Sequence, residues 1–233
     1  MQITERVAAL RRITILAGLS NEGIGRIAET CKWQTYNAGQ TIVDYRGSSS
    51  DVLFLLTGKA RVINYSADGK SVVFVDLAAP ALFGEIAAID RGPRSAGVEA
   101  LEPCTIASLS ARSFEQLMLG EPKIAIAVLR HLAAEVRRLS ERVFEFSTMV
   151  VQNRVQAELI RLAGTVGQTC GEVVLSPAPS LSDIADRIST HREAVSRELS
   201  RLTALGLLRR DHGGLRITDI GRLTKLVNEA KGE

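Results

Sequence analysis

The segment FGEIAAIDRGPRSAG, residues Phe83–Gly97, holds the side chains best suited to bind a charged small molecule. Arg94 carries a guanidinium fork that can bond a phosphate bidentately, and Ser95 adds a hydroxyl beside it. Glu85 would repel an anion placed directly on it, so its carboxylate suits a hydroxyl donor instead. The segment therefore predicts a site that takes a phosphate on one arm of its Gly-Pro turn and a hydroxyl on the other.

The backbone that begins at Gly84 supports the same chemistry. The run Gly84-Glu85-Ile86-Ala87 is typical of the first turn of a short helix, where free N–H groups attract an anion. A simpler interpretation is that Glu85 and Arg94 pair with each other and bind nothing. An exposed ion pair contributes little to stability and would not require the glycine and serine around it, which favours the ligand site.

The bulk composition excludes several classes of protein. The chain has 233 residues, 45% of them hydrophobic, and a formal net charge of +3, so any nucleic-acid surface must be local. No apolar run reaches membrane-spanning length and the N-terminus lacks an export signal, so we expect a cytoplasmic protein with no membrane partner. Cys31, Cys104 and Cys170 are too few and too dispersed for a disulfide framework or a zinc site, and no metal or cofactor is expected.

Residues 1–120 are expected to form the first domain. Short helices occupy about residues 1–33, and Ser20 caps the second of them. From there to about Leu109, β-branched runs such as Ser71–Leu77 and Thr105–Leu109 alternate with glycine turns at near-regular spacing. This pattern predicts a β-roll or jelly roll.

Residues 121–150 are expected to form one long helix, with Pro122 in its first turn. Its apolar residues are spaced alternately three and four residues apart over three heptads, and charged residues flank them. This narrow stripe is typical of a two-stranded coiled coil, whereas a helix packed on its own barrel would usually show a wider one. The predicted homodimer seam comprises Leu129, Leu132, Val136, Leu139, Val143, Phe146 and Val150.

Residues 151–233 are expected to form a second, smaller domain. A Ser-capped helix over Ser180–Ile188 is followed by a tight turn and a second helix over His191–Leu205. The run Leu207–Thr218 is typical of two short strands joined by a glycine turn. Helix, turn, helix and basic hairpin in this order predict a winged helix-turn-helix that binds double-stranded DNA. The alternative is a helical hairpin with a solvated charged face.

The outer face of the second helix is expected to read base edges. Arginine can bond a guanine edge bidentately, and Glu193 can accept from a cytosine amino group. The helix starts and the hairpin are expected to bind phosphates. A dimer would place two such helices about 34 Å apart on a palindromic site. The expected DNA-binding residues are Ser180, Thr190, His191, Arg192, Glu193, Ser196, Arg197, Arg209, Arg210, His212 and Arg216.

From about residue 15 to 228, the chain resembles the cyclic-AMP receptor protein (CRP)/FNR family of bacterial transcription regulators. The resemblance to the cyclic-AMP-binding branch rests on FGEIAAIDRGPRSAGVEA. It implies an α+β fold with a β-roll, a dimerisation helix and a winged helix-turn-helix, and a nucleotide whose ribose binds Glu85 and whose cyclic phosphate binds Arg94 and Ser95. The implied ligand-binding residues are Gly84, Glu85, Ile86, Ala87, Arg94, Ser95, Leu139 and Ser140.

The chain departs from the family where the base is read. The family uses a Thr-Ser pair on the long helix, one residue from each subunit, and here that pair is Leu139-Ser140. Ser140 can still hydrogen-bond a base and Leu139 cannot, while Ser95 could tolerate the exocyclic amine of a syn guanine. Cyclic GMP therefore stays open as a second ligand. The family's Arg-Glu-x-x-x-Arg pattern, present from Arg192 to Arg197, implies a TGTGA-type half-site, and RNA polymerase is a further candidate partner.

The resemblance implies a regulator, not an enzyme, in which a cyclic nucleotide shifts a homodimer to its DNA-binding form. An alternative keeps the fold but senses another signal, or binds DNA constitutively with a vestigial pocket. An iron–sulfur sensor would need about four clustered cysteines, and His131, on the long helix, is interpreted as an ordinary imidazole. No enzyme is expected because no His or Cys near Glu85 in sequence completes a catalytic set.

Overall fold

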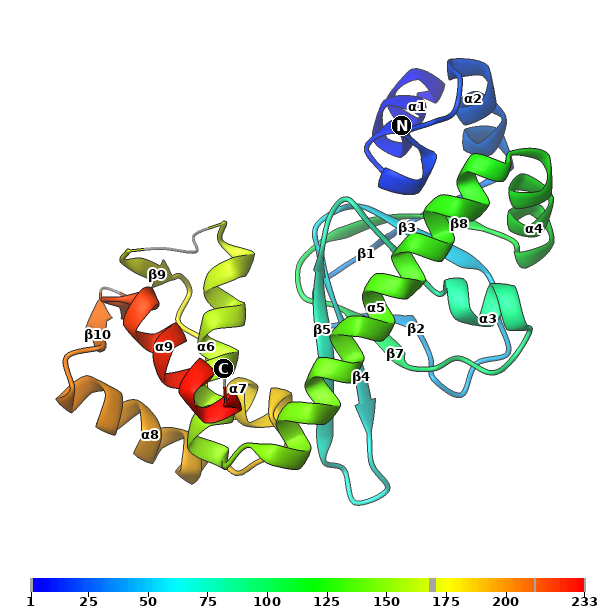
Figure 1. Cartoon of the computed structure of the whole chain (residues 1–233). Helices are drawn as coiled ribbons and strands as arrows, with labels where there is room; N and C mark the ends of the chain where they lie inside the picture. The colour runs from blue at the N-terminus through cyan, green and yellow to red at the C-terminus, as the bar shows by residue number, and fades with distance from the viewer. Residues whose placement is uncertain (1, 168–170, 212, 233) are drawn as a thin grey trace. The chain divides into compact units, whose positions relative to one another are not determined.

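The structure, a computed structural model, describes residues 2–167, 171–211 and 213–232 of the chain. It contains two compact units, Met1–Glu135 and Val136–Glu233, and helix α5 (Pro122–Thr148) contributes to both of them (Figure 1). Two residues of the sequence analysis lie outside the described residues. They are His212, which was expected to bind DNA, and Cys170, which was expected to belong to no disulfide framework or zinc site.

The N-terminal unit is a β-roll made of two four-stranded antiparallel sheets. One sheet has the order β1-β8-β3-β6 and the other the order β2-β7-β4-β5. The predicted roll is therefore confirmed. The strands are β1 Lys32–Tyr36, β2 Thr41–Val43, β3 Val52–Thr57, β4 Lys59–Tyr65, β5 Ser71–Ala78, β6 Ala81–Phe83, β7 Gly97–Ala100 and β8 Cys104–Leu109.

Strand β3 explains how the roll holds two cores. Its residues Leu53 and Leu55 belong to the cluster enclosed by the roll, and Phe54, between them, belongs to a second cluster on the other face. Alternate side chains of a strand point to opposite faces, so a strand covered on both faces must be apolar throughout, as the run VLFLL is.

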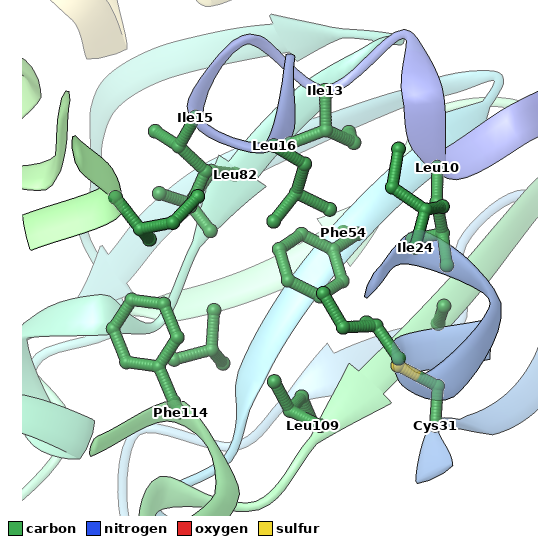
Figure 2. Close-up of a cluster of buried hydrophobic side chains, with 14 of the residues drawn as sticks. Leu10, Ile13, Ile15, Leu16, Ile24, Cys31, Phe54, Leu82, Leu109 and Phe114 are labelled. Atoms are coloured by element: carbon green, nitrogen blue, oxygen red, sulfur yellow. The ribbon is translucent and has the colours of Figure 1, made fainter. Parts of the chain in front are cut away.

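The second cluster lies under the helices of this unit. Figure 2 shows Phe54 among buried side chains that include Leu10, Ile24 and Phe114. These come from α1 (Ile3–Arg11), α2 (Asn21–Thr30) and α4 (Ala111–Gly120), and a 3-10 turn at Thr14–Leu16 completes the cover. Ser20 caps α2 as predicted, because its hydroxyl accepts from the Gly23 N–H at 3.1 Å.

The structure corrects the expected end of the long helix. Helix α5 ends at Thr148, and Val150 is the N-cap of α6 (Val151–Thr165), so Val150 is not a residue of the long helix. The physical reason is Met149, which is 7% exposed and packs with Ala157 and Val227. Burying this side chain in the C-terminal unit turns the chain away from the straight path that continued heptads require.

The C-terminal unit contains the predicted helix-turn-helix and hairpin. Helix α7 (Leu181–Arg187) and helix α8 (Arg192–Ala204) precede strands β10 (Leu208–Asp211) and β11 (Gly214–Ile217). Strand β11 also pairs with β9 (Val173–Leu175), giving the sheet order β10-β11-β9. Helix α9 (Ile220–Lys231), which the sequence analysis did not predict, packs Leu223 into the same core as Val195 of α8.

Candidate functional site

Arg94 is a buried cation held by neutral acceptors. Its side chain is 3% exposed, and it donates to the Gly84 carbonyl at 3.1 Å, the Ser49 hydroxyl at 3.0 Å and the Asp51 carbonyl at 2.9 Å. Within the described residues its Nε N–H has no acceptor. Burial lowers the pKa of Arg94. The nearby negative charges of Asp51 and Glu85 act in the opposite direction but do not cancel this effect. The guanidinium is thus positioned by the fold but not neutralised by an ion pair.

Gly84 makes this position of Arg94 possible. It is the N-cap of α3 (Glu85–Asp90) and has φ +81°, in the left-handed region that favours glycine. A Cβ at this residue would lie 2.7 Å from Arg94 Nη1 and 2.9 Å from the Asp51 carbonyl oxygen. Both the backbone conformation and the close approach of the guanidinium therefore require glycine.

We predict that Gly84→Ala destabilises the N-terminal unit by about 1–3 kcal/mol, because it combines a strained φ with the clash against Arg94. Trp33, the chain's one tryptophan, packs in this unit, so its fluorescence in a urea titration measures the effect. Gly69→Ala is the matched control, since Gly69 has φ +79° but open space around its Cβ position. Equal losses in the two variants would contradict the role given to the Arg94 contact.

Glu85 is also buried, and its partner is not Arg94. The carboxylate residue is 6% exposed, and its Oε1 lies 3.6 Å from Nε2 of His131 on α5. The alternative that Glu85 and Arg94 pair with each other is therefore wrong in this structure. Contact with Glu85 raises the pKa of His131 above its ordinary value, against the opposing effect of burial.

Asn64 of β4 fixes the backbone next to Ser95. Its side-chain oxygen accepts from the Gly97 N–H at 3.0 Å, and its amide donates to the Ser95 carbonyl at 3.4 Å. Sequence reasoning did not assign Asn64 and Ser49 to the site, and it interpreted His131 as an ordinary imidazole. They lie far along the chain from the residues they contact, and no local spacing could have indicated them.

The remaining predicted ligand residues have simpler surroundings. Ser95 is exposed, so its hydroxyl is accessible. Ile86 is 42% exposed and Ala87 is 1% exposed, and each offers a ligand only backbone polar groups. Leu139, 43% exposed, and Ser140 lie on the part of α5 that belongs to the C-terminal unit.

The predicted seam of α5 is largely exposed on this chain. Leu132 is half-buried against the core of the N-terminal unit, whereas Leu129 and Val143 are 60% and 64% exposed. Ile126, one turn before the predicted stripe, is 47% exposed and extends it toward the helix start. The other predicted residues exposed on this stripe are Val136, Leu139 and Phe146, with Val150 just beyond the helix.

The predicted recognition helix, α8, presents charged side chains to solvent. Arg192 and Glu193 pair with each other at 3.0 Å, and their side chains are 71% and 63% exposed. Arg197 is exposed and Ser196 half-buried one turn further on, and His191 is the exposed N-cap. The pKa of Glu193 is lowered, first by a hydrogen bond from its own backbone N–H and then by Arg192.

The start of α7 and the hairpin supply further polar groups. The Ser180 hydroxyl caps α7 by accepting from the Asp183 N–H at 3.0 Å. The Thr190 N–H donates to the Ala185 carbonyl and fixes the turn before α8. Arg209 and Arg210 are exposed on β10.

Arg216 differs from the expectation. It was predicted to bind phosphate, but its guanidinium donates to the Asp211 and Glu172 carboxylates across the three-stranded sheet. The hydrogen bond to Glu172, followed by that to Asp211, raises the pKa of Arg216. Two carboxylates therefore already bond the Arg216 guanidinium within the three-stranded sheet, whereas Arg209 and Arg210 are exposed.

Comparison with known proteins finds two matches to protein families. Residues 33–121 match the family described as cyclic nucleotide-binding domain, and residues 153–226 match the Crp-like helix-turn-helix domain. Together the two matches span most of the chain. The chain belongs to the CRP/FNR family of transcription regulators.

Relatives of this CRP/FNR regulator cover nearly its whole length. It is 23% identical over 218 residues to the CRP-like cAMP-activated global transcriptional regulator of Mycobacterium tuberculosis, covering 93% of this chain and 97% of that one. FixK2 from Bradyrhizobium japonicum shares the fold with a TM-score of 0.71 at 21% identity, over 84% of this chain and 96% of that one. The c-di-GMP responsive regulator CLP from Xanthomonas campestris has a TM-score of 0.73 at 16% identity, over 85% and 99%.

The family settles the coarse function and the fold class. This regulator belongs to a family of cyclic-nucleotide-binding, DNA-binding transcription regulators, not of enzymes, and its fold is α+β as predicted. Over the described ranges, no helix has the length and apolarity to cross a membrane, and no cluster of three or more His, Cys, Asp and Glu could hold a metal ion. Cys31 and Cys104 are buried thiols, and burial raises the pKa of Cys31 to about 12.

A buried ion cluster joins the last turns of α5 to the helix-turn-helix within the C-terminal unit. Glu158 of α6 accepts from Arg142 at 3.1 Å and from Arg161 at 3.0 Å. Arg161 also bonds Glu145 at 2.9 Å, and Arg187 at the end of α7 lies 3.6 Å from Glu158. Arg142 donates further to the Arg187 carbonyl. The cluster therefore fixes α7 to the C-terminal part of α5.

Proposed function

We propose that this CRP/FNR regulator binds cyclic AMP around Arg94 and Glu85, and that the nucleotide shifts a homodimer to a form that binds a palindromic DNA site. The observation that carries the proposal is the buried Arg94, whose acceptors in the described chain are neutral and whose Nε N–H has none. A cyclic phosphate is a monoanion with oxygens that can accept from this edge of the guanidinium. It would supply a bound counter-charge for buried Arg94, which the nearby Asp51 and Glu85 carboxylates compensate only in part.

The surrounding groups fit the other parts of a nucleotide. The exposed Ser95 hydroxyl can donate to the phosphate, and Gly84 has no side chain to cap the N–H groups at the start of α3. Glu85 can accept a hydrogen bond from the ribose 2′-hydroxyl. The site thus separates an anion-binding arm from a hydroxyl-binding arm, as a cyclic nucleotide requires.

The base is less strictly specified than the sugar and phosphate. Leu139 offers no hydrogen bond, which leaves Ser140 as the base-reading hydroxyl of α5 in the proposed dimer. Cyclic GMP is therefore the second candidate ligand, with Ser95 available to the amine of a syn guanine. Affinity for cyclic GMP within about tenfold of that for cyclic AMP is expected if Ser140 alone reads the base.

The homodimer is proposed from the exposed apolar stripe of α5. Val136→Glu is expected to convert the protein to monomers at micromolar concentration, because it places two carboxylates opposite each other in an apolar seam. Ala134→Glu is the matched control, since Ala134 is exposed but lies off the stripe. Sedimentation velocity measures both variants, and a dimer that survives Val136→Glu would contradict the seam.

The DNA half of the proposal assigns base reading to α8 and phosphate binding to the groups around it. The side chains that would face the major groove are those of Arg192, Glu193 and Arg197. On DNA binding, the ion pair between Arg192 and Glu193 would break, and each side chain would bond a base edge instead. Phosphate contacts are assigned to exposed or turn-forming residues, namely Ser180, Thr190, His191, Arg209 and Arg210. The proposed operator has two half-sites of the TGTGA type.

Fluorescence anisotropy with a labelled palindrome of such half-sites tests the gating. At fixed salt, saturating cyclic AMP is expected to raise the DNA affinity at least about tenfold, which corresponds to a DNA-binding form populated to about a tenth or less without nucleotide. A scrambled DNA of equal length is the control. Equal affinity for the palindrome with and without nucleotide would reject gating and favour constitutive DNA binding.

A further inference from the structure

His131 brings a titratable side chain to the site proposed for the nucleotide. It belongs to the part of α5 that packs in the N-terminal unit, and its Nε2 lies 3.6 Å from Oε1 of Glu85. The side chains are 30% and 8% exposed, so the interaction is only partly screened by water.

Glu85 needs such a partner to be a useful acceptor. A carboxylate as buried as this one is costly unless it is paired or hydrogen-bonded. The contact with His131 engages Oε1 and orients the group, while a carboxylate has a second oxygen that can accept from a hydroxyl. The same contact links α3, which holds one end of the proposed site, to the long helix.

Two carboxylates act on the imidazole of His131. Glu85 faces it from α3, and Glu135 lies one helical turn further along α5. Both favour the protonated imidazole, Glu85 most strongly, and burial acts in the opposite direction. The net result is a raised pKa, so the ion pair is fully present below the ordinary pKa of histidine and is lost as the pH rises through the raised value.

We propose that His131 is a positioning residue of the nucleotide site, holding Glu85 for the ribose hydroxyl and making nucleotide affinity depend on pH. The inference rests on the proposed function. The protonated imidazole holds Glu85 in place for the ribose hydroxyl, so nucleotide binding favours the cationic form of His131. Binding then takes up protons near neutral pH, so affinity increases as the pH falls.

Calorimetric titration of the full chain with cyclic AMP at about pH 6 and about pH 8.5, in buffers of different ionisation enthalpy, tests this inference. Wild-type protein is expected to bind about tenfold more tightly at the lower pH, since one pKa unit of additional shift corresponds to a factor of ten. Its heat near neutral pH should vary with the buffer. Neither Arg94 nor the nucleotide titrates in this range, so His131 accounts for the change at this site.

Two variants separate positioning from a merely structural role. His131→Gln keeps a polar side chain but cannot be protonated. Its nucleotide affinity should be the same at both pH values and equal to the weaker affinity of the wild type at high pH, and its binding heat should not depend on the buffer. His131→Arg supplies a permanent cation and should retain the tighter affinity at both pH values. A structural role alone would weaken both variants without changing the shape of their profiles.

The outcomes distinguish this inference from the proposed function. If wild-type protein binds neither cyclic AMP nor cyclic GMP at any pH, the proposed function fails and the role of His131 fails with it. If wild-type protein binds with the same affinity and heat at all pH values, only the role of His131 is overturned. Weaker binding at low pH would also overturn it, because His131 would then compete with the ribose for Glu85.

Discussion

Arg94→Ala is expected to weaken cyclic AMP binding by at least about a hundredfold, because the guanidinium offers two or more charge-assisted hydrogen bonds of roughly 1.5–3 kcal/mol each. Arg94 is fixed before the ligand arrives by the Gly84 and Asp51 carbonyls and the Ser49 hydroxyl, so little ordering has to accompany binding. Competition against a fluorescent cyclic nucleotide measures the change.

Arg91→Ala is the matched control for this loss. Arg91 precedes the same Gly-Pro turn, but its side chain is 73% exposed and pairs with Glu115 at 2.7 Å. Its removal should leave nucleotide affinity within about twofold. Trp33 fluorescence verifies that the N-terminal unit of each variant is folded. A folded Arg94→Ala protein with wild-type affinity would contradict the site.

Glu158→Gln is expected to destabilise the C-terminal unit by about 3–5 kcal/mol, because it removes the shared acceptor of a buried ion cluster. Glu158 is 4% exposed and accepts from Arg142 and Arg161, with Arg187 close by. Without its charge, these three guanidinium groups repel one another, and Glu145 and Asp183 offset this repulsion only in part. The C-terminal unit should then unfold at a lower urea concentration.

Two probes localise this effect. Far-UV circular dichroism reports the helices of both units, whereas Trp33 fluorescence reports the N-terminal unit, whose transition should not move. Glu193→Gln, at an exposed glutamate of α8, is the control and should leave both transitions in place. A Glu158→Gln protein as stable as wild type would show that the cluster does not hold α7 on α5.

Much of the fold could be predicted because its elements follow local rules. Ser20 and Ser180 cap helices as their positions indicated, and Gly turns separate the strands of the roll. The end of α5 could not be predicted, because the heptads continue past Thr148 and it is tertiary burial of Met149 that bends the chain. Helix α9 was missed although its apolar residues pack into the core.

The candidate site was predictable only where its residues are contiguous. Gly84 to Ser95 form one local segment with a recognisable combination of charge, glycine and hydroxyl. Ser49, Asn64 and His131 approach it from other strands, loops and helices, and that approach is set by the closure of the roll and the path of α5. For the same reason, the Arg216 contacts with Asp211 and Glu172 depend on strand pairing and could not be read from composition.

Isothermal titration of the wild-type full chain with cyclic AMP, and separately with cyclic GMP, tests the central claim most directly. The account predicts saturable binding of one nucleotide per chain at micromolar concentration, corresponding to about −8 kcal/mol. Absence of heat with both nucleotides, up to about 1 mM ligand, would contradict it. In that case Arg94 would be a structural cation of the roll, and the CRP/FNR fold would carry a different signal.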